Sequence, residues 1–372
     1  MKDEELKLPF YAKATIFFIG FFALFTMLYI AKSIIVPIVF ATIIAIVLNP
    51  VVNFFVRIRI NRVVAIGIAL LLTFLVFFAF GAFLISQASR LVESWPILVE
   101  KFSSIINQTI TEAADYLDKD PQKIQEWVTK TLGELINTST AAIGQTLVKL
   151  GSGLVILFLL PVYIFLILFY QPILLEFIHR FFGTNNQSQV SKIVTQIKTV
   201  IQRYLIGLVI EVVMVATLDT VALLILGIEY ALLIGILGAL LNMIPYIGGL
   251  VAVAMPMIVA LVTKSSPLYV FYVLAAYYFI QLIDNNYIVP YIVASKVKIN
   301  ALFSIIVVIA GNALWGIPGM FLAIPLLAIV KLICDHIEPL KPWGFLLGDT
   351  MPPLLKIKTI FKKQKINLHD RD

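Results

Sequence analysis

The chain has 372 residues, of which 61% are apolar and only 13% are charged, and its formal net charge is +7. Water-soluble proteins are about half apolar and about one quarter charged, so this composition excludes a soluble globular protein and makes lipid the solvent for most of the chain. A basic excess is expected of loops that face anionic lipid, and we therefore expect no binding of nucleic acid.

Hydrophobic stretches recur along the whole sequence, and most are long enough to cross a hydrocarbon layer of about 30 Å as a helix. The sequence therefore predicts an all-α integral membrane protein with about eight transmembrane segments, two of them broken or hairpin-like, and a small exterior helical subdomain. The expected segments are 14–31, 34–56, 63–86, 148–170, 204–227, 230–263, 267–283 and 299–333.

The charges between these segments predict how the chain is oriented. Lysine and arginine crowd residues 57–62, 171–203 and the C-terminal tail, which the positive-inside rule places in the cytoplasm together with both termini. Acidic residues outnumber basic ones in 87–145, so this region is expected outside. The expected divisions are three transmembrane helices in 1–86, an exterior amphipathic helical subdomain in 87–147, a fourth helix in 148–170, a cytoplasmic amphipathic segment in 171–203, a transport core in 204–335 and a basic cytoplasmic tail in 336–372.

Two hydrophobic stretches, 230–263 and 299–333, are too long for one span and are interrupted by proline and glycine. Each is expected to be either two helices or a hairpin that re-enters the membrane from its own side. An asparagine precedes each break, as in discontinuous helices that bind substrate through freed backbone groups, although tight packing or a simple loop explains the pattern equally well. The candidates for binding are Asn242, Pro245, Gly248 and Gly249 in the first stretch and Asn312, Gly316, Pro318 and Gly319 in the second.

Carboxylic acids inside one expected span are further candidates. An ionisable side chain costs roughly 2.5–3.5 kcal/mol at the bilayer centre, so it is a functional candidate where it occurs. Glu211 and Asp219 lie eight residues apart in 204–227, which places them on broadly the same side of a helix. We expect them to bind a proton or a monovalent cation; the alternative is a structural role, with Arg203 as a partner of Glu211.

A second polar cluster, Gln281, Asp284 and Asn285, lies near the inner end of another span, where a binding site and a solvated helix end are equally good explanations. Elsewhere the sequence has no nucleotide-binding glycine loop, no HExxH and no GxSxG. It has one cysteine, Cys334, and three scattered histidines. We therefore expect no enzyme activity, no cofactor and no metal site, and any energy for transport must come from a gradient.

The order of several motifs resembles the autoinducer-2 exporter family of bacterial membrane transporters. The matching pieces are LNPVVNFFVRIRINRVVAI (48–66), LLPVYIFLILFY (159–170), IPYIGG (244–249), DNNYIVPYIVASKVKIN (284–300) and GNALWGIPGMFLAIPLLAIVKLI (311–333), together with the exterior helical insert. The resemblance implies a multi-pass protein of the bacterial cytoplasmic (inner) membrane with both termini inside. Two positions depart from the family's pattern: Ala294 stands where glycine is frequent, and Tyr170-Gln171 replaces a frequent charged pair.

The resemblance implies export of a small polar solute by a gradient-driven or facilitative transporter. Exchange of sodium or lithium for protons is the alternative, because both activities are attributed to the family. A second alternative is a non-transporting anchor or signalling protein whose exterior domain binds a partner. The expected partners are a small polar solute, a monovalent cation or a proton, and the lipid bilayer, with a homo-oligomer left open.

Overall fold

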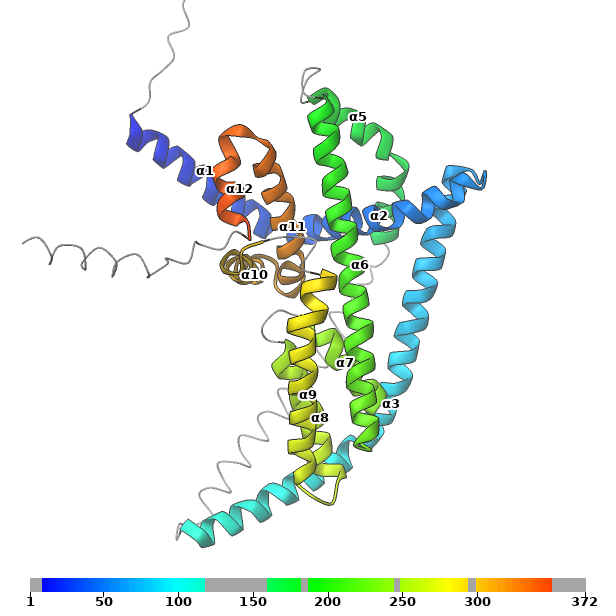
Figure 1. Ribbon diagram of the computed structural model, residues 1–372, viewed down its shortest axis with the longest axis vertical. Coiled ribbons are helices and arrows are strands. Elements are labelled where there is room, and N and C mark those ends of the chain that lie inside the picture. Colours follow the sequence, from blue (N-terminus) through cyan, green and yellow to red (C-terminus); the bar gives the residue numbers. More distant parts are fainter. Residues whose placement is uncertain (1–8, 118–158, 182–186, 244–247, 294–298, 350–372) are drawn as a thin grey trace, which may run out of the picture.

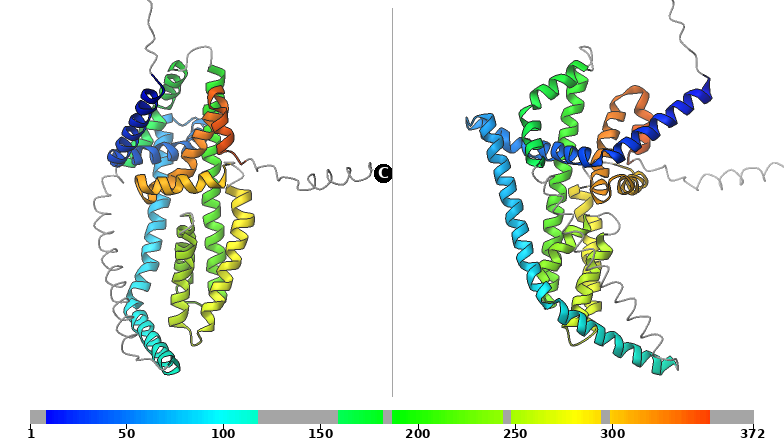
Figure 2. Two further views of the ribbon diagram at one scale, coloured as in Figure 1. Left: turned by 90° about the vertical axis from the view of Figure 1, so that its left-hand side faces the viewer. Right: turned by 180° about the vertical axis from the view of Figure 1, so that it is seen from behind.

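The computed structural model describes residues 9–117, 159–181, 187–243, 248–293 and 299–349. Nearly all of these residues are helical. The β-pairing found among them is an isolated antiparallel bridge between Ile299 and Gly348. The prediction of an all-α membrane protein is therefore confirmed. Figure 1 and Figure 2 show an upright group of helices with the N-terminal and C-terminal helices gathered across one of its ends.

The described chain begins with two helices, α1 (Phe10–Ile30) and α2 (Lys32–Arg57). Both are almost wholly apolar, and α1 has no buried residue, as expected of a helix whose side chains face lipid. The side chain of Trp315 fixes α1 to the rest of the molecule, since its Nε1 donates a hydrogen bond to the carbonyl of Leu28 at 3.0 Å.

The next helix, α3 (Arg62–Leu117), is continuous over 56 residues. Its residues 62–94 are long and apolar enough to cross a membrane, so the helix runs on through residue 86, the expected boundary between the third span and the exterior subdomain. Figure 1 shows the far end of α3 turning away from the upright helices. The remainder of the expected exterior subdomain, 118–147, lies outside the described residues.

A bent pair of helices follows, Leu159–Phe169 and α5 (Gln171–Phe181), with an angle of 62° between them. Arg62 holds the bend, because its Nη2 donates to the carbonyl of Leu168 at 2.9 Å and to Oε1 of Gln171 at 3.0 Å. α5 has a strongly amphipathic pattern and begins at the first residue of the expected segment 171–203.

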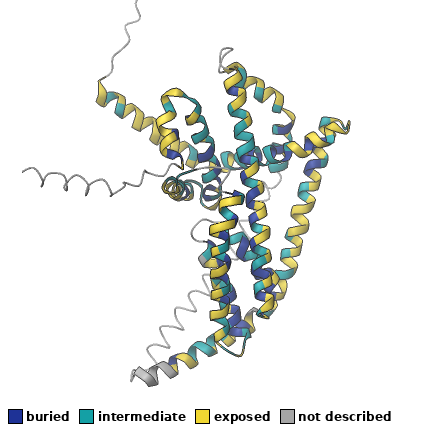
Figure 3. Cartoon of the chain, in the orientation of Figure 1, coloured by how far each residue is buried: buried dark blue, intermediate teal, exposed yellow. Residues whose placement is uncertain are grey.

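The centre of the molecule is built from four helices. α6 (Gln187–Ile225) joins the expected amphipathic segment to the span behind it without a break. α7 (Ala231–Asn242) and α8 (Gly248–Thr263) pack against each other and show that the first broken stretch is two short helices. α9 (Leu268–Ile283) returns beside α6. Figure 3 shows buried residues concentrated where these four helices meet.

The second broken stretch is also a pair of packed helices, α10 (Ala301–Trp315) and α11 (Ile317–His336). Gly316 separates them with a φ of 67°, a backbone conformation that favours glycine. A short 3₁₀ helix (Glu338–Leu340) and α12 (Lys341–Leu347) then fold back on α11.

Within the described ranges, six helices are long and apolar enough to cross a membrane, or seven if the bent pair counts as one span. α7, α8 and α10 are apolar but shorter. The two broken stretches therefore contribute packed pairs of helices, not single long spans, and the chain has the multi-pass architecture that its composition requires.

Candidate functional site

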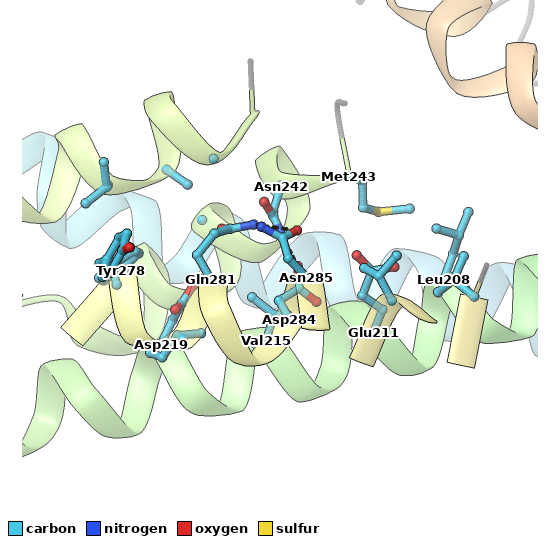
Figure 4. Close-up of a pocket in the computed structure, with 18 of the residues that line it drawn as sticks. Leu208, Glu211, Val215, Asp219, Asn242, Met243, Tyr278, Gln281, Asp284 and Asn285 are labelled. Carbon is cyan, nitrogen blue, oxygen red and sulfur yellow. Dashed lines mark hydrogen bonds between the residues drawn. The ribbon is translucent and has the colours of Figure 1, made fainter. Parts of the chain in front are cut away.

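A cavity of about 880 Å³ lies between α6, α7, α8 and α9, and one of its ends reaches α10, α11 and the residue that follows Gly348. Figure 4 shows polar side chains from several of these helices pointing into it. Polar groups inside a membrane protein commonly face such a cavity because they cannot face lipid. The cavity is therefore the candidate translocation site.

One face of α6 supplies the longest stripe of the lining. Its members recur at intervals of three or four residues, which is the spacing of one helix face: Tyr204, Leu208, Glu211, Val215 and Asp219. Glu211 is 7% exposed and Asp219 is 2% exposed. The two acids predicted to share one side of the span thus do so, and both open onto the cavity.

The opposite wall begins at the point where α9 changes into the π-helix η2 (Asp284–Val293). π-Helical turns are frequent at functional sites because they move side chains out of the α-helical register. Asp284 is the first residue of η2 and is only 2% exposed. Its Oδ2 accepts a hydrogen bond from Nδ2 of Asn242 at 3.0 Å, whereas its Oδ1 has no hydrogen-bond partner among the described residues.

Two further amides stand beside this carboxyl group (Figure 4). Nε2 of Gln281 lies 3.4 Å from Oδ1 of Asn285, a long hydrogen bond between neighbouring turns of one wall. Gln281, Asp284 and Asn285 all line the cavity, together with Asn242 from the end of α7. The structure therefore joins the polar cluster of α9 to the asparagine that precedes the first break.

The cavity is also lined by residues that are not among the candidates expected from the sequence. Tyr277 of α9 is 7% exposed, its hydroxyl has no hydrogen-bond partner among the described residues, and it lines the cavity near Asp219. Its place four residues before Gln281, on the same helix face, is the signal that could have identified it. Asp349 has no comparable signal, because α12 and its fold-back on α11 bring it to the cavity.

The charges that line the cavity are all of one sign. Its described lining holds Glu211, Asp219, Asp284 and Asp349 and includes no lysine, arginine or histidine. A cleft lined with charges of one sign in a low-dielectric wall concentrates ions of the opposite sign, so the ionised form of these acids would attract cations and repel anions. The acids are spread along its length, and no three metal-ligating side chains of the described chain gather closely enough to hold a metal ion.

The candidates of the second broken stretch lie elsewhere. Asn312, Gly316, Pro318 and Gly319 do not line the cavity, and this stretch reaches it only through Ile299, Ser304 and Ile324 among the described residues. Asn312 and Pro318 are exposed, while Gly319 is buried against the backbone of Gly311. The structure thus brings Asn242 and Gly249 of the first stretch to one cavity with α6, and it does not bring these four residues of the second stretch there.

Within the first stretch, the two glycines differ. Gly249 lines the cavity, whereas a Cβ on Gly248 would collide with the backbone of Leu241, so Gly248 allows α8 to start close to the end of α7. Pro245 lies outside the described residues.

Several apolar helices around a buried polar cavity define a multi-pass membrane transporter. The sequence model described as "AI-2E family transporter" matches residues 16–338, and the chain belongs to this family. It is 25% identical to YueF of Bacillus subtilis (strain 168), over 79% of this chain and 82% of that protein. It is 24% identical to the AI-2 transport protein TqsA of Escherichia coli (strain K12), over 86% and 90%, and 24% identical to PerM of the same strain, over 73% and 76%.

Proposed function

We propose that this chain is a gradient-driven transporter that exports a small polar solute through the cavity between α6 and α9, and that the buried carboxyl groups couple this movement to a proton or a monovalent cation. The single observation that supports coupling is the lining: three buried acids and no base among its described residues. A buried carboxyl group without a basic partner is costly unless a proton or another cation neutralises it.

The amides of the same cavity support a polar solute. Asn242, Gln281 and Asn285 offer both donors and acceptors at the cavity wall, which suits hydroxyl and carbonyl groups. The relative TqsA is named an AI-2 transport protein, and AI-2 is accordingly the first solute to test.

Exchange of sodium or lithium for protons is the second candidate. It is favoured by the carboxyl, amide and hydroxyl oxygens of the lining, since such hard oxygen ligands suit monovalent cations, and it would need no organic solute. An anchor that binds a partner outside the cell has less support, because an anchor gains nothing from a buried acidic cavity.

The location follows from the charge bias of the sequence. We propose that the protein lies in the bacterial inner membrane with both termini in the cytoplasm, that the part of 87–147 that follows the span of α3 faces outward, and that further copies of the chain can associate with it.

Flux into proteoliposomes tests the proposal. Purified protein is reconstituted with a pH-sensitive dye inside, and AI-2, sodium and lithium are each supplied with and without a pH gradient. Solute-dependent proton movement supports coupled export, and cation-dependent proton movement without solute supports the exchanger. Flux no greater than that of empty liposomes would exclude both coupled export and cation–proton exchange.

A further inference from the structure

Two glycines of the cavity each face a different pair of polar groups. A Cβ on Gly238 of α7 would lie 3.3 Å from Oδ2 of Asp219 and 3.6 Å from the hydroxyl of Tyr277. A Cβ on Gly249 of α8 would lie 3.4 Å from Oδ1 of Asn242 and 3.4 Å from Oε1 of Gln281. Each glycine therefore leaves open a small space between two polar side chains that come from different helices.

The space at Gly238 is bordered by a carboxyl and a hydroxyl group with no amide. Asp219 is 2% exposed and Tyr277 is 7% exposed, and neither Oδ1 of Asp219 nor the Tyr277 hydroxyl has a hydrogen-bond partner among the described residues. Most buried polar atoms have such partners, so two unpartnered ones on the same space indicate a ligand or an alternative pairing.

The space at Gly249 is bordered by the side-chain amides of Asn242 and Gln281. Asn242 already donates to Asp284, and Gln281 lies within 3.4 Å of Asn285, so these side chains are fixed by one another. Figure 4 shows Asp219 to one side of this amide cluster and Glu211 to the other. The cavity is thus divided along its length into chemically different parts.

We infer that Asp219, Tyr277 and Gly238 form a protonation subsite, separate from the amide subsite of Asn242, Gln281 and Gly249, which holds the solute. This inference rests on the proposed function and assigns its two cargoes to different places. Tyr277 acts as a positioning residue, since its hydroxyl donates to the Asp219 carboxylate once the carboxyl proton has left.

The proton balance of the subsite is simple. The carboxyl O–H bond of Asp219 breaks, the proton leaves to water that enters the cavity, and the Tyr277 O–H stays intact while it donates a hydrogen bond. On loading, a proton from water returns to the carboxylate, and the Tyr277 hydroxyl is released. No oxidant or further reactant takes part.

Few other titratable groups face this subsite. Asp284 of η2 lies close enough to Asp219 to interact with its charge, Glu211 lies two turns away on α6 itself, and Tyr278 lines the cavity beside Tyr277. α7 and α8 bring no titratable side chain to the described lining. A change in protonation at Asp219 is therefore distinguishable from one at Asp284 by single substitutions.

Alanine substitutions at the two glycines make a matched pair. Gly238→Ala places a methyl group between Asp219 and Tyr277, where the Asp219 carboxyl group needs to shift by only a few tenths of an ångström and the Tyr277 hydroxyl is in ordinary contact. Gly249→Ala places the same group at the amides. Gly81→Ala on α3 is the control, because a Cβ there meets nothing within 4 Å.

The first readout is flux in proteoliposomes, with protons followed by an internal pH-sensitive dye and with AI-2 as solute. We expect Tyr277→Phe and Gly238→Ala to slow proton flux about tenfold, the factor for loss of one hydrogen bond to a charged group, and to change its pH profile. Gly249→Ala should reduce AI-2 flux and leave the pH profile of proton flux largely unchanged. Gly81→Ala should behave as the unsubstituted protein.

The second readout does not depend on transport. Infrared difference spectra between low and high pH should contain a protonated-carboxyl band that is lost in Asp219→Asn, shifted in Tyr277→Phe and Gly238→Ala, and unmoved in Gly249→Ala. This result together with no flux from the unsubstituted protein would overturn the proposed function and leave the subsite in place. An Asp219 band unmoved by both Tyr277→Phe and Gly238→Ala, or no such band, would overturn the subsite itself.

Discussion

Gly311 of α10 and Gly319 of α11 lie directly against each other, so that a Cβ built on either glycine would collide with the backbone carbonyl of the other. Small residues at such a point allow two membrane helices to approach closely, and van der Waals contact then holds them together. The glycines of the second broken stretch therefore have a structural role in joining α10 to α11.

Leucine substitutions should separate this role from the lining of the cavity. We expect Gly319→Leu to destabilise the protein by about 3 kcal/mol, because backbone cannot yield as a side chain does, and to lower the midpoint of thermal unfolding in detergent. Gly249→Leu should keep that midpoint near the unsubstituted value while abolishing flux, because its side chain projects toward Asn242 and Gln281. Equal loss of stability in both variants would contradict this distinction.

The broken stretches also show what the sequence could predict. Glycine and proline indicated where each helix pair divides, and the spacing of Glu211 and Asp219 correctly placed both on one helix face. The sequence could not show that Asn242 meets Asp284 while Asn312 remains exposed, because both asparagines precede similar breaks. That difference depends on which helices pack together, and the local pattern contains no information about it.

Asn242→Ala should destabilise the cavity wall. The substitution leaves both oxygens of Asp284 without a hydrogen-bond partner among the described residues, and an unpartnered buried group costs about 1–3 kcal/mol. We expect a lower unfolding midpoint in detergent and reduced solute flux. Asn53→Ala, at an exposed position of α2, is the matched control and should change neither quantity.

Gln171→Glu should stabilise the bend between the helix Leu159–Phe169 and α5. Gln171 accepts a hydrogen bond from Arg62 at 3.0 Å, and a carboxylate at the same place would accept a charge-assisted one. We expect the free energy of unfolding to rise by only about 1 kcal/mol, because the pair is only partly buried. The unfolding midpoint should rise accordingly and fall back at high salt, which screens the charges. An unchanged midpoint would show that the carboxylate turns away from Arg62.

Cysteine labelling tests the orientation. In a Cys334→Ser background, an impermeant reagent added outside intact cells should reach a cysteine at Asp118 and should not reach one at Lys362 until the membrane is opened. The physical basis is the excess of lysine and arginine in 171–203 and in the C-terminal tail. The reverse labelling pattern would place the tail outside and overturn the proposed orientation.

Neutral isosteres at the two acids of α6 test coupling itself. Glu211→Gln and Asp219→Asn keep the shape and much of the hydrogen-bonding capacity of these side chains while removing their titration. If the carboxyl groups carry the coupling ion, gradient-driven flux through the double variant should fall to the level of empty liposomes and lose its pH dependence. Protein yield and the unfolding midpoint should change little or rise, because an uncompensated buried charge has been removed.

A purely structural role predicts the opposite result. The double variant would then lose stability or fail to assemble, and whatever flux remained would keep the pH profile of the unsubstituted protein. Flux with both the size and the pH profile of the unsubstituted protein would exclude coupling through α6. The coupling site would in that case shift across the cavity to Asp284, which is equally buried and whose Oδ1 is without a hydrogen-bond partner among the described residues.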